Sequence, residues 1–193
     1  MTRSTRPVRA LLLVGLVLLA SACSKIEGTG DLNFVKGDGQ VVEVAQGDRE
    51  KPLDFGGTTV QGEPLDITDL RGKVVVLNVW WSGCGPCRAE MPMLVEAEKE
   101  LGKDQVSFVG INIRDLAPET AEAFERDRGV DYPSLYDPGS ETLLKMGRYA
   151  PYAPPATLVL DREGRVAALI NGPIPSKGTL TTVVEDTLAE SDG

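Results

Sequence analysis

The stretch that decides the fold runs from Lys73 to Cys87, KVVVLNVWWSGCGPC. Its first eight residues, as far as Trp80, are nearly all apolar and β-branched, which predicts a strand buried on both faces. The residues that follow, Arg88 to Leu101, have the pattern of a helix. Cys84 and Cys87 therefore lie at the junction between a buried strand and a helix.

This junction gives the two cysteines a specific chemistry. Free backbone N–H groups and the positive end of the helix dipole stabilise a thiolate, so the thiol pKa in redox CxxC sites falls to about 7 from about 8.5. Two intervening residues, Gly85 and Pro86, let the second sulfur reach the first and close a disulfide. Pro86 has no N–H to donate, which costs little near the first helical turn. We therefore interpret Cys84 and Cys87 as a redox dithiol.

The composition removes most other chemistries. The 193 residues include three cysteines and no histidine, which excludes a Ser-His or Cys-His nucleophile and a histidine-ligated metal or haem. A zinc site would need two further ligands, whereas the only other cysteine, Cys23, directly follows the leader segment and is the candidate for lipid attachment. A purely structural disulfide stays open. With 20 basic against 29 acidic residues and a net charge of −9, we expect no nucleic-acid partner.

The N-terminus has the pattern of a bacterial lipoprotein signal peptide over residues 1–22. Three arginines are followed by the apolar run ALLLVGLVLLA (10–20), which is too short to span a membrane. Cys23 follows small residues directly and so resembles the lipobox cysteine, which is lipidated after cleavage; plain secretion stays open. Lipid chains on Cys23 would anchor the protein to the outer face of the cytoplasmic membrane. Cleavage leaves 17 basic and 29 acidic residues, a net charge of −12.

The rest of the chain predicts a spacer over residues 23–52, with at most one short strand, and a single domain over 53–193. A hairpin is expected over 55–67 around the turn Gln61-Gly62-Glu63. The further expected elements are a strand at 106–113, helices at 118–128 and 140–146, a hairpin of strands 157–160 and 166–170, and a final helix at 179–190. This order predicts an α/β fold with a central mixed sheet covered by helices on both faces.

The segment Arg71 to Pro92, RGKVVVLNVWWSGCGPCRAEMP, resembles the signature of the TlpA/ResA-like, membrane-anchored thiol–disulfide oxidoreductases of the thioredoxin superfamily. The resemblance extends over about residues 53–190. It implies a thioredoxin-like three-layer fold with an N-terminal β-hairpin extension. It also implies that Cys84 is the attacking thiol and Cys87 the buried resolving thiol. Glu90 matches an acidic position that modulates thiol ionisation in the family, and an exposed helix-surface glutamate is the alternative.

The same resemblance implies supporting roles and reveals two departures. Pro155 matches the family's cis-proline, with a rigid trans loop as the alternative, and Trp80 ends the strand that leads to the dithiol. Residue 83 is usually tryptophan in the family but is Gly83 here, and we expect Trp81 to cover part of that surface. Pro154 lacks the N–H that the residue before the cis-proline often donates to substrate, so one backbone pairing is lost.

The function that the resemblance implies is reduction of protein disulfides outside the cytoplasm, with apocytochrome c as one candidate substrate. Electrons would come from a membrane thiol donor, and no cofactor is expected because no GxGxxG motif is present. A thiol oxidase would use the same residues, and a redox-silent binding module stays open. A thiol peroxidase is disfavoured because Trp81 and Leu77 stand where that class has Thr or Ser and Pro.

Overall fold

The computed structural model describes residues 34–35 and 41–190, which belong to the second of two compact units, Asn33–Gly193. The predicted signal peptide over 1–22 and the predicted lipid-attachment residue Cys23 lie outside the described residues. In the described ranges, no helix has the length and the apolar character needed to cross a membrane.

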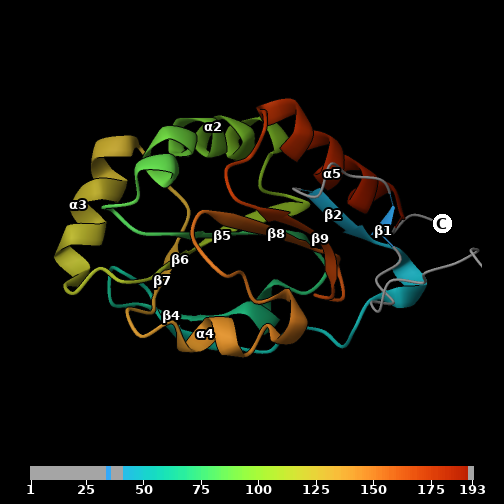
Figure 1. Ribbon diagram of the computed structural model, residues 1–193, viewed down its shortest axis with the longest axis horizontal. Coiled ribbons are helices and arrows are strands. Elements are labelled where there is room, and N and C mark those ends of the chain that lie inside the picture. The colour runs from blue at the N-terminus through green and yellow to red at the C-terminus, as the bar shows by residue number, and fades with distance from the viewer. Residues whose placement is uncertain (1–33, 36–40, 191–193) are drawn as a thin grey trace, which may run out of the picture. The chain divides into compact units, whose positions relative to one another are not determined.

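A seven-stranded mixed sheet forms the centre of the described part (Figure 1). Its strands lie in the order β1 (Phe34–Val35), β2 (Val41–Val44), β9 (Val166–Asn171), β8 (Ala156–Leu160), β5 (Val74–Trp80), β6 (Val106–Asn112) and β7 (Ser134–Tyr136). The interior strand β5 is parallel to β6 and antiparallel to β8. All seven residues of β5 are buried, which confirms the strand expected to be covered on both faces.

Helices lie on both faces of this sheet. One face carries α2 (Gly85–Leu101), α3 (Pro118–Arg128) and α5 (Lys177–Ala189), and the other carries α4 (Glu141–Leu144) and the hairpin of β3 (Gly56–Thr58) and β4 (Pro64–Asp66) (Figure 1). Three short 3-10 helices, Gln46–Asp48, Ile67–Leu70 and Gly147–Tyr149, complete the described elements. Alternate residues of β5 point to opposite faces of the sheet, each of which has its own hydrophobic core. Val76 and Trp80 belong with Leu94 of α2 to the first core, whereas Val75 and Leu77 belong to the second core. The α/β three-layer fold with a hairpin extension is confirmed.

Two helices begin earlier than the sequence pattern suggested. The helix expected from residue 88 begins at Gly85, because the sulfur of Cys84 accepts the N–H of Cys87 and so caps the first turn. The last helix, expected from residue 179, begins at Lys177, because the hydroxyl of Ser176 accepts the N–H of Thr179. Side-chain caps therefore extend both helices by two or three residues.

Two strands were not assigned to defined residues from the sequence: β7 at one edge of the sheet and β2 next to the other edge. The strand β7 has three residues, too few to show an alternating pattern, and it pairs only with β6 among the described strands. The strand β2 lies within the expected spacer over 23–52 and pairs antiparallel with β9. Arg49, whose side chain is buried, extends this attachment by an ion pair of 3.0 Å with Asp161 and a second one with Glu190 of the C-terminal segment. The central sheet therefore begins before residue 53.

Candidate active site

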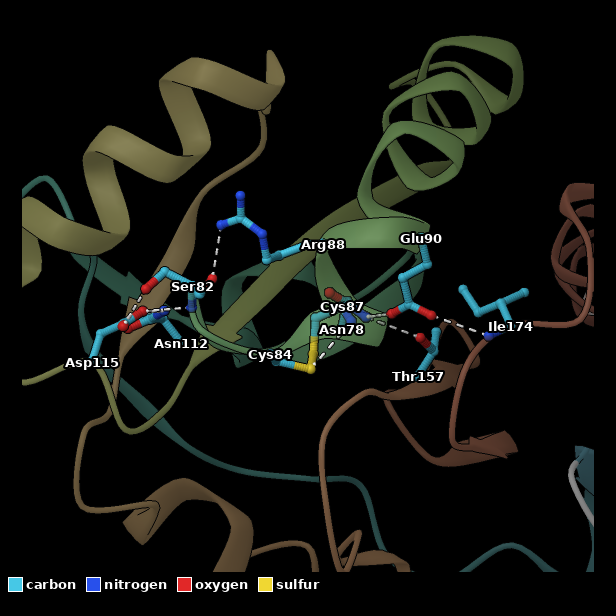
Figure 2. Close-up of a disulfide and its surroundings, with 10 residues drawn as sticks. All are labelled: Asn78, Ser82, Cys84, Cys87, Arg88, Glu90, Asn112, Asp115, Thr157 and Ile174. Atoms are coloured by element: carbon cyan, nitrogen blue, oxygen red, sulfur yellow. Dashed lines mark hydrogen bonds between the residues drawn. A yellow bond between two sulfur atoms is a disulfide. The ribbon is translucent and has the colours of Figure 1, made fainter.

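Cys84 and Cys87 form a disulfide at the carboxyl end of β5, where the chain turns into α2 (Figure 2). Cys84 is the N-cap residue of α2, and its sulfur accepts the backbone N–H of Cys87 at 3.1 Å. Cys84 is 6% exposed, whereas Cys87 is completely buried. A sulfur at this position faces the helix N-terminus, which favours the thiolate of the reduced form. The exposed fractions indicate that an incoming disulfide reaches Cys84 rather than Cys87.

The two residues between the cysteines form the open end of α2. Gly85 and Pro86 are both exposed, and a Cβ added to Gly85 would meet no atom within 4 Å. Pro86 occupies the first turn, where its missing N–H removes no helical hydrogen bond. The helical ladder begins with the N–H of Arg88, which donates to the carbonyl of Cys84 at 3.0 Å. The link between the two cysteines is therefore exposed to solvent, whereas Cys84 is nearly and Cys87 completely buried.

Glu90 is a buried carboxylate on the sheet-facing side of α2, with 5% of the residue exposed. Its Oε1 accepts the amide N–H of Asn78 at 3.0 Å, and its Oε2 accepts the backbone N–H of Ile174 at 3.1 Å (Figure 2). The same Asn78 nitrogen donates to the hydroxyl of Thr157 at 3.2 Å. Burial raises the pKa of Glu90, and the two hydrogen bonds oppose this shift only in part. Glu90 is therefore not the exposed helix-surface residue that the sequence left open.

The peptide bond between Pro154 and Pro155 is cis, as the resemblance implied. Pro155 is buried and precedes β8, and the pairing of Ala156 with Val79 places it at the end of β5 from which the dithiol loop departs. Its carbonyl accepts the N–H of Gly172 at 3.1 Å. Pro155 and the dithiol loop therefore lie at the same end of the neighbouring strands β8 and β5.

The two tryptophans before the dithiol have different surroundings. Trp80 is completely buried, its indole nitrogen donates to the hydroxyl of Ser134 at 3.3 Å, and its ring lies 5.1 Å from that of Phe124. Trp81 is half-buried, and its ring covers Gly83: a Cβ at residue 83 would lie 2.2 Å from Cζ3 of Trp81. The ring of Trp81 thus lies over residue 83, as expected, and only glycine leaves room for it there.

A group of polar side chains on the other side of the dithiol loop was not predicted from the sequence. The buried carboxylate of Asp115 accepts the N–H of Ser82 at 2.9 Å, the hydroxyl of Ser82 at 2.6 Å and the amide of Asn112 at 2.8 Å (Figure 2). Asp115 is the second residue after the expected strand 106–113. The rule that functional side chains gather at the carboxyl ends of parallel strands is the signal that could have identified it. Within residues 34–35 and 41–190, no three His, Cys, Asp or Glu side chains form a group that could hold a metal ion.

Comparison with known proteins agrees with this geometry. The family model described as Redoxin matches residues 45–186. The thiol:disulfide interchange protein HelX of Rhodobacter capsulatus is 34% identical over 128 residues, which is 65% of this chain and 68% of that protein. The thiol-disulfide oxidoreductase ResA of Bacillus subtilis is 28% identical over 111 residues, 58% of this chain and 60% of that protein.

The structural comparison extends over more of the chain. The solved structure of a secreted thiol-disulfide isomerase from Corynebacterium glutamicum is 32% identical, has a TM-score of 0.71, and aligns with 80% of this chain and 96% of that chain. Together with the disulfide at the N-terminus of α2, these matches confirm the resemblance that the segment 71–92 carries. The chain belongs to the Redoxin family and is a thiol–disulfide oxidoreductase with a thioredoxin-like fold.

Proposed function

We propose that this enzyme reduces protein disulfides outside the cytoplasmic membrane, with Cys84 as the attacking thiol and Cys87 as the resolving thiol. The observation that supports this assignment best is the difference between the two cysteines. Cys84 caps the helix and is the more exposed, whereas Cys87 has no exposed surface. An attacking thiolate needs access and stabilisation, and a resolving thiol needs only to reach the first sulfur.

The proposed cycle has two exchange steps. The Cys84 thiolate attacks one sulfur of the substrate disulfide, forms a mixed disulfide and releases the other substrate sulfur as a thiolate. The Cys87 thiolate then attacks the Cys84 sulfur, which closes the enzyme disulfide and releases the second substrate thiolate. The substrate gains two electrons and two protons, and the enzyme dithiol loses them. A reduced dithiol protein of the membrane restores the enzyme by the reverse exchange.

We assign to Glu90 the proton that leaves Cys87 in the second step. The two residues are three positions apart on α2 and so lie on the same helix face. A buried carboxyl with a raised pKa takes up a proton closer to neutral pH than an exposed one does. It can therefore receive the proton of the Cys87 thiol, and it returns the proton when the substrate thiolate leaves.

We expect Pro155 to border the docked substrate. The pairing of β5 with β8 places Pro155 near the carboxyl end of β5, where the chain leads into the dithiol loop. Pro154, which precedes it, is half-buried and has no N–H to donate to a substrate strand. The substrate is therefore held by fewer backbone hydrogen bonds than the family usually provides. This favours extended or incompletely folded polypeptides, which adapt to the site by contacts other than strand pairing.

We further propose that Cys23 carries the lipid anchor and that apocytochrome c is one physiological substrate. The leader pattern before Cys23 and the relative described as secreted support a location outside the cytoplasm. The choice of apocytochrome c rests on the family resemblance of the segment 71–92. Mass spectrometry of the mature N-terminus tests the anchor: a diacylated Cys23 supports it, and an unmodified N-terminal residue contradicts it.

Reduction of insulin disulfides with dithiothreitol as the electron source tests the proposed chemistry. Cys84→Ser should abolish turnover, whereas Cys23→Ser, which removes a cysteine outside the dithiol, should leave it unchanged. Turnover that survives Cys84→Ser would overturn the proposal. Equilibration of the dithiol with glutathione buffers gives its reduction potential, and a value above that of the substrate disulfide would indicate an oxidase.

A trapping experiment tests the substrate. Because Cys87→Ser cannot complete the second step, this variant should accumulate mixed disulfides in the cell envelope. The trapped proteins, identified by mass spectrometry, should include apocytochromes. A set of partners without apocytochromes contradicts that part of the proposal and leaves the disulfide-reductase assignment intact.

A further inference from the structure

The loop between β6 and α3 contains a backbone conformation that ordinary residues rarely adopt. Arg114 has a φ of 64°, one of two positive φ values among the described non-glycine residues. The N–H of Asp115 donates to the carbonyl of Ile113 at 2.8 Å, which closes a three-residue turn across Arg114. A hydrogen bond between residues i and i+2 with positive φ at the central residue marks the rarer, strained form of the γ-turn. Such strain persists only where the surroundings hold it, and it concentrates at functional sites.

The surroundings that hold this turn connect it to the dithiol loop. The hydroxyl of Tyr136 donates to the carbonyl of Asp115 at 3.0 Å, and the amide of Asn112 donates to its carboxylate. The carboxylate in turn accepts both the N–H and the hydroxyl of Ser82, which lies two residues before Cys84. Thus the strained turn directs the Asp115 carboxylate at one residue of the dithiol loop.

Ser82 is held from its other side as well. Its carbonyl accepts a hydrogen bond of 3.0 Å from the guanidinium of Arg88, which lies in the first turns of α2 (Figure 2). The same guanidinium lies 5.3 Å from the ring centroid of Phe124 of α3. All three hydrogen-bonding groups of Ser82, its N–H, hydroxyl and carbonyl, are therefore occupied by partners from other parts of the structure.

We propose that Asp115 is a positioning residue of the redox site, which acts through Ser82 to hold the sulfur of Cys84 over the N-terminus of α2. This inference rests on the proposed attack by Cys84. The Asp115 carboxylate binds Ser82 and Asn112, so it acts on the sulfurs only indirectly. It fixes the loop in which the N–H of Cys84 donates to the carbonyl of Trp81 at 3.1 Å, and that loop sets where Cys84 begins the helix. Loss of the contact lets the sulfur move away from the N–H of Cys87.

The size of the effect follows from the distance dependence of these interactions. The hydrogen bond from Cys87 to the Cys84 sulfur is 3.1 Å long, and a displacement of about 1 Å removes it. Misplacement of a reacting group by that amount costs about 100-fold in rate in unfavourable cases. We therefore expect Asp115→Ala to slow attack by Cys84 by about 10- to 100-fold at neutral pH.

The test measures the reactivity of the Cys84 thiol as a function of pH, without any protein substrate. The full chain carrying Cys87→Ser is reduced, alkylated with iodoacetamide over a range of pH, and the rate at Cys84 is followed by mass spectrometry. With Asp115→Ala, the midpoint of the pH profile should move upward, because the thiolate loses its stabilisation. Asp115→Asn keeps an oxygen for the N–H of Ser82 and should stay near the parent profile.

Two further variants make the result specific. Ser82→Ala removes only the hydroxyl contact and should shift the midpoint part of the way, and adding it to Asp115→Ala should cause no further shift. Asp66→Ala is the control, because Asp66 also accepts the N–H and hydroxyl of a single residue, Thr68, but where β4 leads into the 3-10 helix Ile67–Leu70. It should not move the midpoint.

An unchanged pH profile in Asp115→Ala overturns the inference. If Asp115→Ala does not fold, an unchanged profile in Ser82→Ala overturns it equally. Because alkylation needs no protein substrate, these outcomes are independent of insulin turnover. A failure of the proposed reductase function, in which Cys84→Ser still reduces insulin, is therefore distinguishable from a failure of the positioning role.

Discussion

The effect of Gly83→Ala on the free energy of unfolding is expected to depend on Trp81. The substitution should destabilise the parent protein, and it should be neutral or stabilising in a Trp81→Ala variant. The backbone of Gly83 lies outside the positive-φ region, so alanine is compatible with its conformation. At such a position alanine stabilises a protein by about 0.4–1 kcal/mol, because it restricts the unfolded chain. The ring of Trp81 prevents this gain, since the new Cβ would lie 2.2 Å from Cζ3 and 2.6 Å from Cη2.

The cost follows from how far the ring must move. Ordinary carbon–carbon contact begins at about 3.5 Å, so the ring of Trp81 must retreat by about 1.3 Å. Trp81 is half-buried and packs against both cores, which limits that movement. Overpacking of this kind costs about 1–3 kcal/mol. For a chain of this size, Gly83→Ala should therefore lower Tm by about 2–12 °C.

Thermal and urea unfolding of four proteins tests this reasoning: the parent, Gly83→Ala, Trp81→Ala and the double variant. The alanine at residue 83 should destabilise the parent and should be neutral or stabilising once Trp81 has been removed. The coupling free energy should be about 1–3 kcal/mol. An equal loss of stability in both backgrounds would refute the conclusion that the ring of Trp81 is what requires glycine at this position.

Three further substitutions test the burial and electrostatics of the fold. Glu90→Gln should change how the free energy of unfolding depends on pH. Burial raises the folded-state pKa of Glu90 above 4.5, so the parent loses stability as pH rises through the raised pKa. The glutamine variant should not show this loss, because its side chain does not titrate. Urea unfolding between about pH 4 and pH 8 measures it, and parallel curves would contradict the prediction. Arg49→Ala should cost about 1.5–3 kcal/mol, because it removes the 3.0 Å charged partner of buried Asp161, which keeps only Arg165 at 2.8 Å as a cation, and unchanged urea unfolding would contradict a stabilising buried pair. Leu94→Ala, at a completely buried position of α2, should cost about 2–5 kcal/mol in the same assay, and full stability would be inconsistent with close packing of α2 on the sheet.

Local patterns were sufficient to predict the elements that carry the dithiol. The apolar run of β5 and the helical pattern after Cys87 are properties of neighbouring residues, so they can be recognised without the rest of the fold. The position of the cysteines at a helix N-terminus follows from those two elements alone. The cis bond before Pro155 came from the family resemblance, because the dipeptide itself permits either isomer.

Features that depend on distant segments could not be predicted in this way. The buried carboxylate of Glu90 accepts a hydrogen bond from the backbone N–H of Ile174, 84 residues further along the chain. The contact of Asp115 with Ser82 joins residues 33 positions apart, and no spacing in the sequence indicates it. The short strand β2 has too few residues to reveal its pairing with β9. Tertiary packing, and not local propensity, decides these features.

The most direct test of the central claim is to identify which cysteine forms the mixed disulfide. The reduced Cys87→Ser and Cys84→Ser variants are mixed with a peptide that contains one disulfide, and the adducts are mapped by mass spectrometry. The account predicts a stable adduct on Cys84 in the first variant and little adduct on Cys87 in the second, because Cys87 is completely buried. A rapidly formed adduct on Cys87, with none on Cys84, would contradict the assignment of Cys84 as the attacking thiol.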